Sequence, residues 1–341
     1  MPGTTTRTSV RSATPQSIET AARALRAGAL VAFPTETVYG LGARADDPHA
    51  VARIFAAKGR PADHPLIVHV AEASALAQIA ASVPPSAWTL AERFWPGPLT
   101  LVLPKAPSVP PEVTGGLDTV AVRVPAHPVA RALLQAAQVP VAAPSANRFG
   151  RTSPTTAAHV QAEFGDTVAY VLDGGPCTVG LESTIVDLSG ATPAILRPGG
   201  IPRVAVEAAL GTHLNTSNAN RPRAPGSLPA HYAPAVPLEV VPAADLERYV
   251  ADHGDDLPVG LLAFEAPPFG DEALRFWAMP ADPVAYGRLL YARLREAESC
   301  CGRILVASPP EDPAWEAVWD RLRRAAIGAR STETPREVGR G

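Results

Sequence analysis

Residues 58–70 read Lys58-Gly-Arg-Pro-Ala-Asp-His-Pro-Leu-Ile-Val-His-Val70. The apolar spacing before them predicts a helix over 47–58, and the apolar run 65–70 predicts a strand. A helix that passes through a Gly/Pro turn into a strand is typical of an α/β fold. Lys58 and Arg60 lie on that turn, and cations of both types hold phosphoryl oxygens in proteins. The alternative is a solvated turn, which a lone Lys-x-Arg would favour.

The composition is that of a globular protein with more than one domain. At 341 residues the chain is too long for one typical core, and 46% hydrophobic against 18% charged residues supplies ample material for buried sheets. A net charge of -3 excludes a general basic field, so any RNA contact would be local.

The cysteines and the N-terminus indicate a reducing, non-membrane environment. Cys177, Cys300 and Cys301 are too few and too unevenly spaced for a disulfide framework or a zinc knuckle, so we expect the cytoplasm. No apolar run approaches the roughly 20 residues that span a bilayer. Residues 1–17 contain Thr, Ser and Arg without acids, and we interpret them as a frayed tail, with a transit peptide as the alternative.

Further along the chain, apolar runs predict the remaining elements of an α/β domain. We expect helices over 17–27, 76–81 and 86–94, and strands over 29–33, 99–103, 119–124, 139–143, 168–173 and 183–188. The loop over 34–42 leaves its strand where sites form in α/β sheets, and it holds Thr35, Glu36, Thr37 and Tyr39. Turn chemistry that satisfies backbone groups explains these residues equally well.

A glycine pattern in this loop needs separate treatment. Residues 40–45, Gly-Leu-Gly-Ala-Arg-Ala, match a dinucleotide fingerprint with a terminal Ala. Such a fingerprint requires an immediate helix and an acidic residue at a strand end about 20 positions on. Pro48 interrupts the helix start and Asp63 lies in a Pro-flanked turn, so we interpret the match as accidental.

Several isolated polar residues are candidates for ligand contacts. Arg123 lies between Val122 and Val124 on an expected strand, and a buried cation requires either an internal carboxylate or an anionic ligand. His69 is of interest only if its face of the strand lines a cleft. Ser145 and Asn147 follow a short strand, where an Asx or Ser turn is the ordinary alternative.

Two more candidates follow in the second half of this region. The segment 153–156, Ser-Pro-Thr-Thr, predicts a helix N-cap whose amides suit an anion, and Arg197 is placed on a Pro/Gly turn.

Seven motifs in order make the chain resemble the Sua5/YciO/YrdC family over roughly residues 16–205. They are Phe33-Pro-Thr-Glu-Thr-Val-Tyr-Gly-Leu-Gly42, Lys58-Gly-Arg60-Pro61, Pro65-Leu-Ile-Val-His69, Val122-Arg123-Val-Pro125, Pro144-Ser145-Ala-Asn147, Ser183-Thr-Ile-Val-Asp187 and Arg197-Pro-Gly199. The resemblance implies a twisted mixed sheet with helices around a concave cleft.

The C-terminal part resembles the long, Sua5 type of this family, whose extra domain is a small Rossmann-like α/β unit. We expect strands over 258–264 and 303–307 and helices over 283–297 and 313–326. The predicted division is a flexible tail over 1–15, a YrdC-like domain over 16–205, a linker crossing the cleft over 206–235, the Sua5-type domain over 236–330 and a tail over 331–341. The linker carries Ser227-Leu-Pro-Ala230 where many members have a basic and aromatic run.

The family reaction joins L-threonine, bicarbonate and ATP into threonylcarbamoyl-AMP with release of pyrophosphate, for the t6A modification of tRNA. The resemblance implies that the nucleotide is held by Lys58, Arg60, Ala62, Ser145, Asn147, Ser153, Arg197 and Tyr232, with Lys58 and Arg60 also acting in catalysis. It assigns threonine to Thr35, His69, Arg123 and Ser183. No metal ligands are predicted in the chain, and Mg2+ is expected through the nucleotide phosphates.

The expected partners are these substrates and downstream t6A transferase proteins, with tRNA contact not required. Two other functions were weighed. The family's concave surface resembles one that accommodates double-stranded RNA, but the net charge argues against RNA binding as the main role. Carbamoyl transfer in hydrogenase maturation normally needs acylphosphatase and zinc-finger regions, for which this chain has neither the length nor the cysteines.

Overall fold

The computed structural model describes residues 9–214, 222–251, 258–269 and 273–330. The chain forms two compact units: one comprises residues up to 149 together with 153–227, and the other comprises 150–152 and the chain from 228 onward. The second unit thus includes residues 150–152, a short segment that interrupts the first unit in the sequence. The predicted tail over 331–341 lies outside the described residues.

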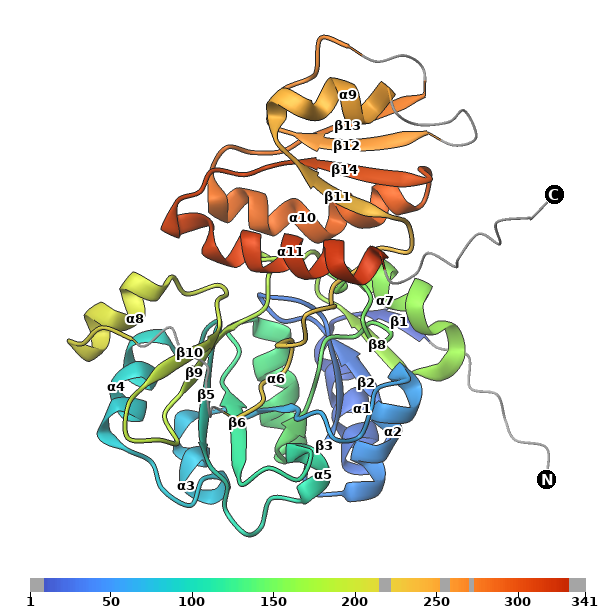
Figure 1. Cartoon of the computed structure of the whole chain (residues 1–341). Helices are drawn as coiled ribbons and strands as arrows, with labels where there is room; N and C mark the ends of the chain where they lie inside the picture. Colours follow the sequence, from blue (N-terminus) through green and yellow to red (C-terminus); the bar gives the residue numbers. More distant parts are fainter. Residues whose placement is uncertain (1–8, 215–221, 252–257, 270–272, 331–341) are drawn as a thin grey trace, which may run out of the picture. The chain divides into compact units, whose positions relative to one another are not determined.

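The first unit is built on a ten-stranded mixed sheet, which confirms the predicted fold class (Figure 1). Its strand order is β1-β8-β2-β3-β7-β4-β6-β5-β9-β10. The strands are β1 (Ser9–Ser12), β2 (Val31–Phe33), β3 (Gly40–Arg44), β4 (Ile67–His69), β5 (Leu99–Pro104), β6 (Thr119–Arg123), β7 (Val141–Ala142), β8 (Tyr170–Asp173), β9 (Thr184–Asp187) and β10 (Ala194–Arg197).

Helices cover this sheet unevenly. The helices are α1 (Pro15–Arg26), α2 (Pro48–Lys58), α3 (Leu76–Ile79), α4 (Pro85–Phe94), α5 (Pro111–Thr114), α6 (Pro128–Ala137), α7 (Ala157–Phe164) and α8 (Arg203–Leu210). Helices α1 and α6 pack on one face over β2, β7 and β8, where Phe33, Val141 and Leu172 are buried. The opposite face carries the larger core, with Leu41, Val68 and Val122 among its members.

The remaining half of the α1/α6 face, over β4 to β10, carries a small apolar cluster. It consists of Ile67, Val102, Ala121, Ile185 and Leu196 together with Ala224. Ala224 belongs to the segment after α8, so the first part of the predicted linker packs on the sheet. Helix α8 spans the predicted domain boundary at 205/206, so this boundary falls inside a helix and not at the start of a linker.

The N-terminal prediction is wrong in part. Residues 9–12 form β1, which pairs in parallel with β8, so the frayed tail expected over 1–15 does not extend to them. Helix α1 then begins with a capping box in which Thr14 and Ser17 bond to each other's backbone amides. The capping box satisfies N–H groups that the first turn leaves without helical partners.

The glycine pattern at 40–45 is a strand, which confirms that the dinucleotide match is accidental. Strand β3 pairs antiparallel with β2, so the loop expected over 34–42 is shorter than predicted. Gly42 is required by packing: a Cβ there would lie 2.8 Å from a Phe33 ring carbon and 2.9 Å from a Val141 methyl. This glycine admits close neighbours and does not serve a phosphate.

The second unit is a parallel α/β sheet, as expected for a Rossmann-like domain. Its strand order is β11-β14-β12-β13, and its elements are β11 (Leu238–Val241), α9 (Leu246–Ala251), β12 (Val259–Ala263), β13 (Leu274–Ala278), α10 (Pro283–Glu298), β14 (Arg303–Ala307) and α11 (Glu316–Arg330). The sequence analysis missed β11 and β13, which are short. No helix among the described residues has the length and apolarity to cross a membrane.

Candidate active site

The candidate site lies on the face of the sheet that carries the small apolar cluster. In β4 and β6 the register pairs Ile67 with Ala121 and His69 with Arg123. Residues two apart on a strand share a face, so each strand presents one apolar and one polar side chain to this surface. The result is a polar row, His69 and Arg123, beside the apolar cluster on the same face of the sheet.

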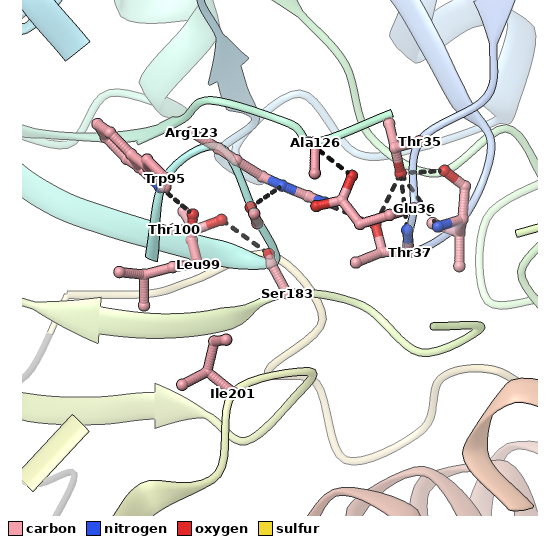
Figure 2. A network of polar contacts seen from close by, with 12 residues as sticks. Thr35, Glu36, Thr37, Trp95, Leu99, Thr100, Arg123, Ala126, Ser183 and Ile201 are labelled. Atoms are coloured by element: carbon pink, nitrogen blue, oxygen red, sulfur yellow. Dashed lines mark hydrogen bonds and ion pairs between the residues drawn. The ribbon is translucent and has the colours of Figure 1, made fainter. Parts of the chain in front are cut away.

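Arg123 is held by an internal carboxylate. Its NH2 nitrogen lies 2.6 Å from Glu36 Oε1, while NH1 donates to Thr37 Oγ1 at 2.9 Å and Nε to the Gly97 carbonyl at 3.2 Å (Figure 2). The other Glu36 oxygen accepts the backbone N–H of Ala126 at 3.0 Å. Of the two options that the sequence left open for this cation, the structure shows the internal ion pair.

Thr35 organises the loop that presents Glu36. Its hydroxyl donates to the Val38 carbonyl at 2.6 Å and accepts the N–H groups of Thr37 and Val38, each at 3.2 Å. These bonds form a side-chain-supported turn. The predicted turn chemistry is therefore present, and it places Thr35, Glu36 and Thr37 together beside Arg123 (Figure 2).

His69 is neutral at physiological pH. Burial, helped by the Arg123 guanidinium, lowers the pKa of His69 to about 3, against the opposing effect of backbone hydrogen bonds at Ile67 and Val141. The ring packs edge-on against Phe33, with ring centroids 6.1 Å apart. A neutral imidazole can both donate and accept a hydrogen bond.

Arg197 and Ser183 continue the polar surface. Arg197 donates to the Ser183 carbonyl at 2.8 Å and to its hydroxyl at 3.1 Å, and it also donates to the Pro225 carbonyl at 2.9 Å. The Ser183 hydroxyl lies 2.7 Å from that of Thr100. Arg197 is the last residue of β10, not part of a turn as predicted, and it links the sheet to the segment that carries Ala224.

Lys58 joins α2 to the loop after β7. The helix ends where Gly59 adopts a left-handed conformation, which glycine accommodates at little cost. Lys58 Nζ then donates to the carbonyl of Ser145 at 2.6 Å and to that of Asn147. Burial and the nearby Arg60 guanidinium hold the pKa of Lys58 well below its ordinary value, although Glu163 opposes them.

The other predicted nucleotide residues differ in exposure. Arg60 is buried, donates to the Pro65 carbonyl at 3.1 Å and lies over the Phe149 ring, 5.8 Å from its centroid. Ala62 is exposed. The amide of the buried Asn147 donates to the carbonyl of the next residue at 2.7 Å.

The helix N-cap predicted within 153–156 is present, and the capping residue is Thr156, not Ser153. Thr156 caps α7, its hydroxyl accepting the His159 N–H at 3.2 Å. The Ser153 hydroxyl donates instead to Glu182 Oε1 at 2.6 Å, and both residues are buried. Ser153 therefore forms a buried hydrogen bond with the carboxylate of Glu182.

Tyr232 belongs to the second unit. Its backbone has a positive φ of 62°, its ring stacks on Tyr291 at 5.8 Å between centroids, and Arg321 lies 5.0 Å from the ring centre. The Thr152 hydroxyl donates to the Tyr232 carbonyl at 3.3 Å, so the segment 150–152 of the same unit contacts Tyr232. The other eleven predicted site residues belong to the first unit.

The sequence analysis did not assign Glu36, Thr100 or Glu182 to the site. All three are buried, at 6%, 0% and 6% exposure. The available signal for Glu36 was Arg123 itself, because a cation expected inside a protein predicts a carboxylate nearby. For metal ions, the described residues contain no group of three His, Cys, Asp or Glu that could hold one.

Comparison with known proteins agrees with this architecture. The family model for Sua5/YciO/YrdC proteins, described as "Telomere recombination", matches residues 23–199, and a model described as "Threonylcarbamoyl-AMP synthase, C-terminal domain" matches residues 201–327. A threonylcarbamoyl-AMP synthase of Bacillus subtilis is 40% identical over 91% of this chain and 93% of its own. One of Pyrococcus abyssi is 51% identical over 66% of this chain and 67% of its own.

Solved structures lead to the same family. The crystal structure of P. abyssi Sua5 complexed with L-threonine matches with a TM-score of 0.84 and 40% identity, covering 93% of this chain and 96% of that one. The match extends through both units, and the first family model alone spans more than half of the chain. The chain therefore belongs to the Sua5/YciO/YrdC family, in the two-domain form that carries the Sua5 C-terminal domain.

Proposed function

We propose that this protein is a threonylcarbamoyl-AMP synthase, which condenses L-threonine, bicarbonate and ATP to threonylcarbamoyl-AMP and pyrophosphate. The observation that carries the proposal is the Bacillus subtilis relative of that name, 40% identical over nearly the full length of both chains. The product would serve the t6A modification of tRNA in the cytoplasm, through downstream transferase proteins.

The chemistry requires positioning more than a reactive side chain. Bicarbonate takes up a proton and loses water to supply CO2. The neutral threonine amine adds to CO2 and loses a proton to give a carbamate, and a carbamate oxygen then attacks the α-phosphorus of ATP as the bond to pyrophosphate breaks. No covalent protein intermediate is needed. Holding the two reactants in line and stabilising the developing charge supply the rate enhancement.

The threonine part of the site is proposed on the polar row of the sheet. Arg123 suits the substrate carboxylate, because its bonds to Glu36, Thr37 and Gly97 use three of the five guanidinium N–H groups and leave two for an anionic ligand. Neutral His69 and the hydroxyls of Thr35 and Ser183 suit the polar groups of an amino acid that carries its own hydroxyl. The buried Ile67 and Ala121 beside them suit its methyl group.

The nucleotide part is proposed around Lys58 and Arg60. Both are buried cations, and a buried cation attracts phosphate more strongly than an exposed one. The proposal keeps the remaining predicted nucleotide contacts, which are Ala62, Ser145, Asn147, Ser153, Arg197 and Tyr232.

Mg2+ is proposed as the metal that accompanies ATP. Magnesium usually binds through substrate phosphates and at most one or two carboxylates. The metal would neutralise phosphate charge, and the protein would hold it only through the phosphates that Lys58 and Arg60 bind.

The test measures pyrophosphate release from ATP and Mg2+, with L-threonine and bicarbonate each omitted in turn. Release that requires both is the expected result. Release that ignores threonine, or none from folded protein, would overturn the proposal. Salt-dependent tRNA binding without threonine-dependent turnover would instead favour an RNA-binding role.

A further inference from the structure

The Arg123–Glu36 pair has a property that the assignment of Arg123 to the threonine carboxylate does not use. The two side chains are 4% and 8% exposed, and they meet at 2.6 Å. Glu36 is fixed from both sides, since its second oxygen accepts the Ala126 N–H. As a unit the pair carries one positive and one negative charge.

The titratable groups that face this pair do not alter its charge balance near pH 7. Burial lowers the pKa of His69 to about 3 and raises that of Cys177 to about 12, and it also lowers the pKa of His127. The two imidazoles and the thiol are therefore neutral. The guanidinium and the carboxylate of this pair therefore balance each other, and Arg197, which donates to Ser183, adds a positive charge that stays the same when Glu36 is changed.

A buried ion pair whose two charges cancel interacts unequally with charged ligands that bind beside it. A simple carboxylate brings one uncompensated negative charge into a region of low dielectric, which is unfavourable. An α-amino acid brings a carboxylate and an ammonium group, so its arrival leaves the net charge unchanged. Without Glu36 the charge of Arg123 would be uncompensated, and the preference would move toward the simple carboxylate.

We infer that Glu36 is a positioning and specificity residue, which orients Arg123 and balances its charge so that the site selects a zwitterionic amino acid over a simple carboxylate. This inference rests on the proposed function, in which L-threonine binds beside Arg123. Under this inference, the preference for a substrate with an ammonium group depends on the charge of Glu36, even where the Glu36 carboxylate does not contact that ammonium group.

The test compares three ligands by calorimetry with the full-length protein at pH 7.5. L-threonine is compared with (R)-3-hydroxybutyrate, which lacks the ammonium group, and with (R)-1-amino-2-propanol, which lacks the carboxylate. The wild-type protein is expected to prefer threonine over both. Glu36→Gln keeps the side-chain shape and one hydrogen-bond acceptor, and we expect it to shift the ratio of affinities toward 3-hydroxybutyrate by about tenfold or more.

Two further variants separate charge from structure. Glu36→Asp keeps the charge and should keep the wild-type ratio. Arg123→Gln removes the positive charge of the pair and should shift the ratio of affinities away from 3-hydroxybutyrate and toward 1-amino-2-propanol. This variant tests the charge argument even if Glu36→Gln does not fold. Asp187→Asn, the same chemical change at a buried carboxylate that caps a turn at Ser189, should leave all ratios unchanged.

The outcomes distinguish this inference from the proposed function. If wild-type protein binds threonine and Glu36→Gln loses affinity for threonine and 3-hydroxybutyrate equally, Glu36 is only structural and the inference fails while the function stands. If folded wild-type protein binds no threonine, with or without ATP and Mg2+, the proposed function fails first.

Discussion

Replacing Lys58 with Met tests whether this lysine holds the loop after β7. The substitution keeps an unbranched side chain of similar length but removes the ammonium group, which donates to the carbonyls of Ser145 and Asn147. A hydrogen bond from a charged donor contributes roughly 1.5–3 kcal/mol, and a buried acceptor left without a donor costs about 1–3 kcal/mol. Part of this loss is offset, because the buried charge and its desolvation penalty disappear as well.

We therefore expect Lys58→Met to lower the free energy of unfolding of the first unit by about 2–4 kcal/mol. The chain offers a matched control, since Lys105 makes a single 3.5 Å contact with the Val109 carbonyl from a half-buried position. Lys105→Met should cost less than about 0.5 kcal/mol, as surface substitutions do. The assay is urea unfolding followed by circular dichroism, with two transitions allowed for the two units.

The same variant links stability to the proposed chemistry. If Lys58 places the Ser145 and Asn147 loop for ATP, Lys58→Met should weaken ATP binding together with the loss of stability, while threonine binding in the absence of ATP persists. Unfolding of Lys58→Met at the same urea concentration as Lys105→Met would refute the structural argument. Unchanged ATP affinity in a destabilised variant would refute only the functional one.

Two further predictions concern pH and packing. The pKa of His69 is about 3 in the folded protein and about 6.5 in the unfolded one, so between these pH values the unfolded state binds the extra proton and stability is lost as pH falls from 6.5 toward 3. The free energy of unfolding should therefore fall with decreasing pH by at most about 1.4 kcal/mol per pH unit, and this dependence should be weaker in His69→Gln. Equal pH dependences of the two proteins in urea unfolding at pH 4–7 would contradict the prediction. Gly42→Ala should lower the free energy of unfolding by about 1–3 kcal/mol, because the new Cβ would crowd Phe33 and Val141. Gly40→Ala is the control, since its Cβ would meet only ordinary contacts at 3.4 Å or more. Equal urea midpoints for the two variants would contradict this prediction, because the strand would then shift without cost.

Much of the first unit's element order could be predicted because its segments bury continuous apolar runs or helical stripes. Helix α2, predicted over 47–58, begins at Pro48 after the N-cap Asp47 and ends at Lys58. Strand β14 has its predicted bounds. Caps and apolar runs are local signals, which is why these elements could be predicted. Strands β1, β11 and β13 were missed because each is short or partly exposed, and their pairing partners decide them. The boundary predicted at 205/206 falls inside α8, which continues to Leu210 with Gly211 as its C-cap, beyond the motif that suggested the boundary.

By itself the sequence determined the fold class, the two-domain organisation and the family, since these depend on residue types in order along the chain. Only the tertiary structure decided which polar groups contact one another: Arg123 with Glu36, Lys58 with the carbonyls of the loop over 144–147, and Ser153 with Glu182. These partners lie 87, 87, 89 and 29 positions apart for Arg123–Glu36, Lys58–Ser145, Lys58–Asn147 and Ser153–Glu182. Contacts over such separations follow from sheet register and loop closure, which no local pattern of apolar and polar residues specifies.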